Sequence, residues 1–139
     1  MTTARDIMHF GVECVSENET IDVAAKMMRE LDVGSLPVCG SDDRLKGIIT
    51  DRDIVLRCVA AGHDPARVRC GDLTDGTLVW VNCDADVDDA LMAMRENQIR
   101  RLPVMEDHRL VGMISEADLA AHLPDEKLAM TVGQIYAQN

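Results

Sequence analysis

Aromatic residues are scarce, making up 2% of the 139 residues: Phe10, Trp80 and Tyr136. The chain therefore has few rings on which nucleic-acid bases could stack. Basic residues are also in the minority, 14 against 25 acidic ones, and the net charge of −11 repels a phosphate backbone. We expect no nucleic-acid partner. Hydrophobic residues still make up 47% of the chain, so a core of aliphatic and Met side chains is expected.

Long apolar runs are missing as well. No stretch approaches the ~20 residues of a membrane span, so we expect no membrane partner. Residues 1–8 lack the charged segment and apolar stretch of a signal peptide, which favours a cytoplasmic location. The five cysteines show no C-x-x-C spacing and the four histidines are scattered. We therefore expect no metal site and no secreted disulfide framework.

The chain repeats itself. Residues 28–38 and 94–104 share Met-Arg-Glu and Leu-Pro-Val in the same register, 66 residues apart. Residues 44–54 and 109–119 match with an offset of 65, so one residue is missing from a polar turn between the two segments. Matches at this spacing indicate two copies of one unit. The predicted division is repeat 1 at 1–62, a linker at 63–67, repeat 2 at 68–124 and a helical tail at 125–139.

Each repeat reads as strand-helix-strand-strand-helix (β-α-β-β-α), which makes the fold class α+β. The first strands are expected at 12–15 and 78–81, the hairpin's second strands at 45–50 and 110–115, and the last helices at 51–61 and 116–122. Thr20 and Asp86 are expected to cap the longer helices. The side chains expected to face the core are Ile21, Ala24, Ala25, Met28 and Leu31 in the first copy, and Val87, Ala90, Leu91 and Met94 in the second.

A seven-residue motif ends the last strand of each repeat: Gly47-Ile-Ile-Thr-Asp-Arg-Asp53 and Gly112-Met-Ile-Ser-Glu-Ala-Asp118. The hydroxyl and the carboxylate three residues later fit a helix capping box. The same two groups could instead hold a phosphate and the two hydroxyls of a ribose. The two readings are compatible, because a cap can release its donors when a ligand arrives.

This motif, preceded by Leu-Pro-Val and repeated in tandem, resembles a CBS domain pair, also called a Bateman module, over residues 4–124. The resemblance implies two repeats related by a pseudo-twofold axis, with clefts between them that bind AMP, ADP, ATP or S-adenosylmethionine. It also implies that the protein is a regulatory sensor and not an enzyme, and that it requires no cofactor. The ligand-binding residues that it implicates are Val12, Leu36, Val38, Thr50, Arg52 and Asp53 in one site, and Leu78, Leu102, Val104, Ser115 and Asp118 in the other.

The two sites are not expected to bind equally, because Ala117 stands where the first motif has Arg52. The family resemblance also implies a homodimer, an effector protein, and a role in adaptation to low oxygen or other stress. It further suggests a disulfide between Cys14 and Cys39, which would make the chain a redox-responsive, partner-binding protein with empty nucleotide clefts. Two small buried residues in a reducing cytosol remain the alternative for this pair.

Overall fold

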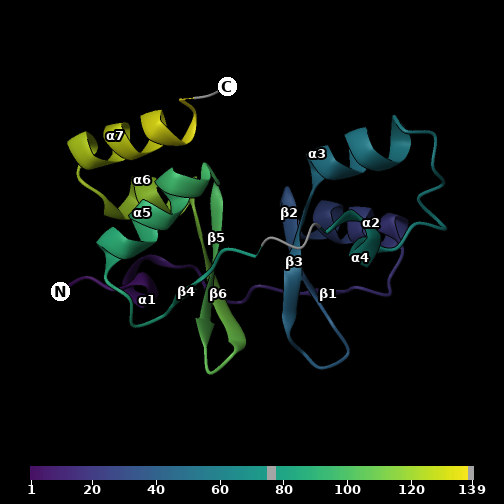
Figure 1. The fold of residues 1–139 in the computed structure, drawn as a ribbon, viewed down its shortest axis with the longest axis horizontal. Helices are drawn as coiled ribbons and strands as arrows, with labels where there is room; N and C mark the ends of the chain where they lie inside the picture. Colours follow the sequence, from purple (N-terminus) through teal and green to yellow (C-terminus); the bar gives the residue numbers. More distant parts are fainter. Residues whose placement is uncertain (75–77, 138–139) are drawn as a thin grey trace. The chain divides into compact units, whose positions relative to one another are not determined.

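The computed structural model describes residues 1–74 and 78–137, which form two compact units (Figure 1). The middle unit contains Glu13–Leu78, and the terminal unit combines Met1–Val12 with Val79–Asn139. Among the described residues, no helix is long and apolar enough to cross a membrane. The α+β class predicted from the sequence is confirmed, because each unit combines one three-stranded sheet with helices.

The middle unit is built on the sheet β1-β2-β3. Its strands are β1 (Val15–Ser16), β2 (Ser35–Cys39) and β3 (Leu45–Thr50), with β1 parallel and β3 antiparallel to β2. Its helical segments are α2 (Ile21–Leu31), α3 (Asp51–Asp53), η1 (Ile54–Val59) and α4 (Cys70–Leu73).

The terminal unit repeats this plan with the sheet β4-β5-β6. Its strands are β4 (Val81–Asn82), β5 (Arg101–Glu106) and β6 (Arg109–Ser115). Its helices are α1 (Ala4–Ile7), α5 (Val87–Asn97), α6 (Glu116–His122) and α7 (Asp125–Ile135). Register matches between the units as well, because Val38 pairs with Gly47 and Val104 pairs with Gly112. Helix α7 accounts for most of the expected helical tail, whose last two residues lie outside the described ones.

The first strand of each repeat is shorter than expected from the sequence. Only Val15 and Val81, the last residues of the expected stretches, are paired, and each strand runs one residue further. The expected helix at 51–61 also differs, because one α-helical turn gives way to a π-helix at Ile54. There the N–H of Ala60 donates to the carbonyl of Val55, five residues back, at 2.8 Å.

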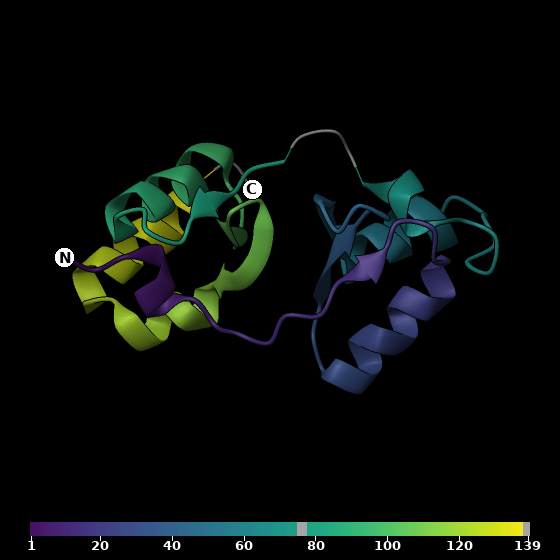
Figure 2. The same ribbon diagram turned by 90° about the horizontal axis from the view of Figure 1, so that it is seen from below.

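Short helices are exchanged between the two repeats. Helix α1, which precedes repeat 1 in the chain, packs in the terminal unit against α5, α6 and β6. Figure 2 shows the purple N-terminal segment against the green and yellow helices of that unit. Helix α4, which precedes repeat 2, packs in the middle unit against β1 and β3. The backbone bridges agree, since Thr3 pairs with Asp86 and Thr20 with Arg69, each 66 residues from its counterpart. The two units are defined by packing in space, and the expected repeat ranges are defined by similarity along the sequence. The two divisions therefore have different boundaries.

The longer helices confirm part of the expected core. In α5, Val87, Ala90, Leu91 and Met94 are all buried. In α2, Ile21, Ala24 and Met28 are buried, but Ala25 and Leu31 are exposed, against expectation. Leu91, the counterpart of Ala25, is fully buried because α5 packs against α1 and α7. The expected cap on α2 is also wrong: Thr20 occupies the N-cap position, but its hydroxyl donates to the Asp22 carboxylate.

Candidate functional site

The first motif joins β3 to α3. The N–H of Thr50 donates to Oδ2 of Asp53 at 3.0 Å, and the N–H of Asp53 donates to Oγ1 of Thr50 at 3.1 Å. This reciprocal pair is the capping box that the spacing predicted. Both residues are half-buried at the end of the strand, while Arg52 between them is exposed. A hydroxyl, a carboxylate and a guanidinium are therefore carried by four consecutive residues of the middle unit.

The second motif joins β6 to α6 and makes the same cap. Oδ2 of Asp118 accepts from the N–H of Ser115 at 2.8 Å and from its hydroxyl at 2.9 Å. The N–H of Asp118 approaches Oγ of Ser115 at 3.4 Å. Each unit of the structure thus brings together the hydroxyl and the carboxylate that the sequence pattern singled out, through bonds that are local in the chain.

The second carboxylate has an additional partner that the sequence did not predict. Nδ1 of His9 lies 2.7 Å from Oδ2 of Asp118. The backbone holds this histidine in place, because His9 and Met113 exchange N–H to carbonyl bonds of 3.0 and 3.1 Å. Gly112 allows the close approach, since a Cβ at that position would lie 2.8 Å from the His9 carbonyl oxygen. In this repeat the motif glycine therefore makes room for the chain's own N-terminal segment.

A cavity of about 270 Å³ lies beside the second motif. Its lining residues come from the start of β5 and from the strand-helix junction: Arg100, Arg101, Ser115, Glu116 and Ala117. Two guanidinium groups thus stand near the motif that has alanine in place of Arg52. One carboxylate oxygen of Glu116 is buried with no hydrogen-bond partner in the described part of the chain. Sequence reasoning missed both arginines, although their position directly before Leu-Pro-Val was a usable signal.

The apolar residues implicated by the family resemblance lie in two kinds of surroundings. Leu36, Val38, Leu102 and Val104 are almost completely buried in the cores of their own units. Val12 and Leu78 are only half-buried. The four core side chains are already surrounded by protein, so a ligand could reach them only through their backbone atoms. Their assignment to a ligand site remains a prediction.

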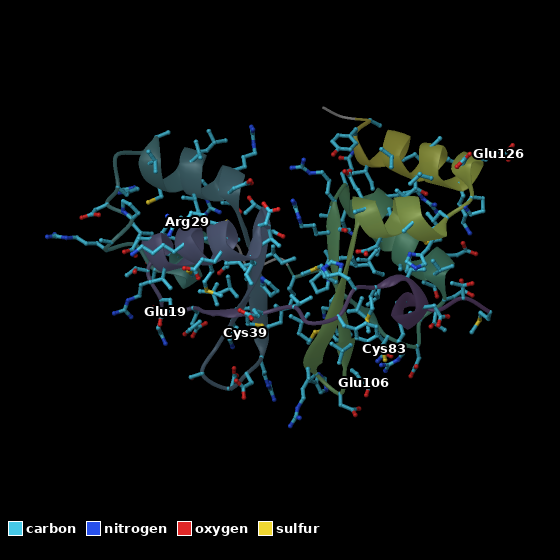
Figure 3. The ribbon with its side chains drawn as sticks, turned by 180° about the vertical axis from the view of Figure 1, so that it is seen from behind. Glu19, Arg29, Cys39, Cys83, Glu106 and Glu126 are labelled. Carbon is cyan, nitrogen blue, oxygen red and sulfur yellow. The ribbon has the colours of Figure 1, made fainter. Side chains whose placement is uncertain are left out.

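Cys14 and Cys39 lie close together in the middle unit. Cys14 is exposed, and Cys39, at the end of β2, is half-buried; both are free thiols. Burial, and after it a hydrogen bond with the Cys14 side chain, raises the pKa of the Cys39 thiol to about 12. Figure 3 labels Cys39, which lies at the end of β2 in the sheet β1-β2-β3. The Cys39 thiol thus has the Cys14 thiol as a hydrogen-bonding neighbour, which the sequence alone left open.

A third cysteine belongs to an ionic cluster in the terminal unit. Sγ of Cys83 lies 2.9 Å from a guanidinium nitrogen of Arg5 and 3.1 Å from Oε2 of Glu106, and Arg5 forms an ion pair with Glu106 (Figure 3). Cys83 is fully buried. The cluster joins α1 to the ends of β4 and β5, so it anchors the N-terminal segment that carries His9.

Comparison with known proteins places the fold. The sequence model of the CBS domain matches residues 4–59 and 70–125. The chain belongs to the CBS-domain family. Hypoxic response protein 1 of Mycobacterium tuberculosis is 50% identical over 135 residues, covering 97% of this chain and 94% of that protein. The CBS domain-containing protein YhcV of Bacillus subtilis is 36% identical over 100% of this chain and 99% of its own length.

A solved structure supports the same relationship. The crystal structure of Hypoxic Response Protein I with two coordinated zinc ions has a TM-score of 0.81 to this chain at 53% identity, covering 88% of this chain and 100% of that one. Within residues 1–74 and 78–137 of the present chain, no group of three or more His, Cys, Asp or Glu side chains could hold a metal ion.

Proposed function

We propose that this CBS-domain protein is a regulatory sensor that binds an adenosine-type ligand, namely AMP, ADP, ATP or S-adenosylmethionine, at its two strand-helix motifs. The observation that carries the proposal is the hydroxyl–carboxylate pair at the same place in both units, Thr50 with Asp53 and Ser115 with Asp118. A carboxylate can accept bonds from both hydroxyls of a ribose, and such charge-assisted bonds contribute roughly 1.5–3 kcal/mol each.

The positively charged side chains that would bind a phosphate come from different parts of the chain at the two motifs. In the first motif it is Arg52, within the motif itself. In the second it is the pair Arg100 and Arg101, which line the adjoining cavity. Guanidinium groups suit phosphate because their planar array of donors can bind two oxygens together. The charge therefore favours a phosphorylated adenosine over S-adenosylmethionine.

An equilibrium titration with AMP, ATP and S-adenosylmethionine tests this function. We expect binding below millimolar concentration, with a loss of at least about tenfold in the double variant Asp53→Ala, Asp118→Ala, because each substitution removes the acceptor for the sugar. Asp107→Ala, in the exposed turn before β6, is the matched control and should leave binding unchanged. Failure of all three ligands to bind at millimolar concentration would contradict the proposal, as would unchanged binding in the double variant.

A second candidate function is a redox-responsive, partner-binding protein, and it is favoured by the neighbouring thiols of Cys14 and Cys39, which share a hydrogen bond. Oxidation would join the two sulfur atoms and release two protons and two electrons to a cellular thiol–disulfide couple. Mass spectrometry of protein alkylated at once on lysis distinguishes the two states. The oxidised form predicts two fewer alkylated cysteines in the wild type than in fully reduced protein. Full alkylation of all five thiols would contradict this candidate.

The chain would act through other proteins and not as an enzyme, since the two CBS repeats account for most of its length. A homodimer is the expected assembly, and exposed apolar side chains on the helices support it: Leu31, Val55, Leu56 and Val59 in the middle unit, and Met92 and Met130 in the terminal unit. The expected setting is the cytoplasm, in a response to low oxygen or other stress, as the relative's name suggests. Light scattering tests the dimer, and a monomeric mass would contradict it.

A further inference from the structure

The two motif carboxylates have different neighbours, and the difference comes from the N-terminal segment. Oδ2 of Asp118 has three partners at hydrogen-bond distance, the N–H and hydroxyl of Ser115 and Nδ1 of His9. Within the described residues, Oδ2 of Asp53 accepts one hydrogen bond, from the N–H of Thr50. The residue that lies 66 positions after His9 is Asp75, which is outside the described residues. The sequence therefore has a histidine at position 9, whose imidazole contacts the second motif, and an aspartate at the equivalent position of the other repeat.

His9 is held firmly although its ring is half-exposed. Two backbone bonds to Met113 fix its main chain against β6. Helix α1, just before it, is anchored through the buried side chains of Ala4 and Ile7 and through the Arg5–Cys83–Glu106 cluster. The His9 side chain is 48% exposed and that of Asp118 only 15%. The imidazole is therefore the more exposed member of the pair, and it lies against a carboxylate that is largely buried.

We propose that His9 is a latch on the second motif, so that a ligand reaches Asp118 only by displacing the imidazole. The inference rests on the proposed nucleotide function. A ribose needs acceptor positions on this carboxylate, and the imidazole already takes one of them. The second motif accordingly binds a ribose ligand more weakly than its own hydroxyl, carboxylate and arginines would allow. The first motif carries no such cost from His9.

Calorimetric titration with ATP tests the latch in a background where only the second motif is intact. Asp53→Asn supplies this background, and His9→Ala is added to it. We expect the added substitution to tighten ATP binding about tenfold, the value of one charge-assisted hydrogen bond recovered for the ligand. Phe10→Ala is the matched control, since Phe10 is the next residue, is 66% exposed and should leave the affinity unchanged.

The outcomes separate the latch from the function on which it rests. Equal ATP affinity with and without His9→Ala, while the wild type binds ATP, would overturn the latch alone. No ATP binding by the wild type or by any variant would overturn the nucleotide function and the latch together. A ligand-free measurement stands beside these: the ring signals of His9 in nitrogen-15 NMR should move in Asp118→Asn and stay in place in Asp53→Asn. Unchanged signals in Asp118→Asn would also overturn the latch.

Discussion

The two units of this molecule share a sheet order, a register and a capped motif, yet they differ in what lies around these features. The terminal unit has α7 packed on α5 and α6, and α1 with His9 beside its motif. In the middle unit Ala25, the counterpart of the buried Leu91, is exposed. Local sequence thus repeats the motif, and the segments at the chain ends make the two copies unequal. The predictions below sharpen this contrast, from the largest effect to the smallest.

The largest expected effect is on the covered helix of the terminal unit. Leu91→Ala should lower the free energy of unfolding by about 2–5 kcal/mol, because it leaves a cavity under α1 and α7. Ala25, the position in α2 that matches Leu91, is already alanine, so the comparison is Leu31→Ala at the end of α2; because Leu31 is 40% exposed, this change should cost roughly 0.5 kcal/mol or less. Urea unfolding measures both. Equal losses would contradict the burial of Leu91 beneath its neighbouring helices and the exposure of Leu31.

The next effect concerns the approach of the N-terminal segment to β6. Gly112→Ala should cost about 1–3 kcal/mol, since the new Cβ meets the His9 carbonyl and the Met8 side chain. Gly133→Ala is the control, because a Cβ there has no neighbour within 4 Å and the residue lies in α7. That substitution should raise the stability by about 0.5–1 kcal/mol through helix propensity. If Gly112→Ala proved neutral, the segment would not lie where the structure places it.

The caps themselves should contribute less. Thr50→Ala and Ser115→Ala each remove an acceptor at a helix start, at a cost of about 1 kcal/mol. Ser115→Ala should cost the more of the two, because the Ser115 hydroxyl also donates to Asp118. Thermal unfolding of the two variants makes the comparison. A neutral result in both would mean that the hydroxyls are not caps.

The smallest effect is a pH dependence at Cys39. Burial raises the pKa of this thiol from 9.0 to about 12, so the folded state favours the protonated form. Its contribution to stability is complete below pH 9.0 and is lost as the pH rises towards 12. In folded protein at pH 8.5, iodoacetamide should therefore modify the exposed Cys14 before Cys39, whereas in urea the two should react alike. Rapid modification of Cys39 in the folded protein would contradict the raised pKa.

Local features were predictable from the sequence, because their causes are local. Each hydroxyl–carboxylate cap spans four residues, and the hairpin strands of both repeats follow from the repeated Leu-Pro-Val and glycine positions. The burial of Ala25 and Leu31 was predicted wrongly, since helical periodicity locates an apolar stripe but does not say whether another helix covers it. The sequence of the tail did indicate a helix, but not which face it would cover.

The contact between His9 and Asp118 could not be predicted, because 109 residues separate the two in the chain. It depends on the exchange of short helices, which places α1 with the second repeat. A signal for this exchange was present: Asp6 and Ile7 lie 66 residues before Asp72 and Leu73, so each repeat begins with a helix of its own. Arg100 and Arg101 could be assigned to the second site only after the structure showed that they line the same cavity as Ser115.

The central claim is that the two motifs hold the same kind of ligand unequally, and backbone amide NMR during an ATP titration tests it most directly. The account predicts that the amide signals of Thr50 and Asp53 move first, with those of Ser115 and Asp118 following only at higher ATP concentration. Signals at Ser115 and Asp118 that move first, or none that move at either motif, would contradict it.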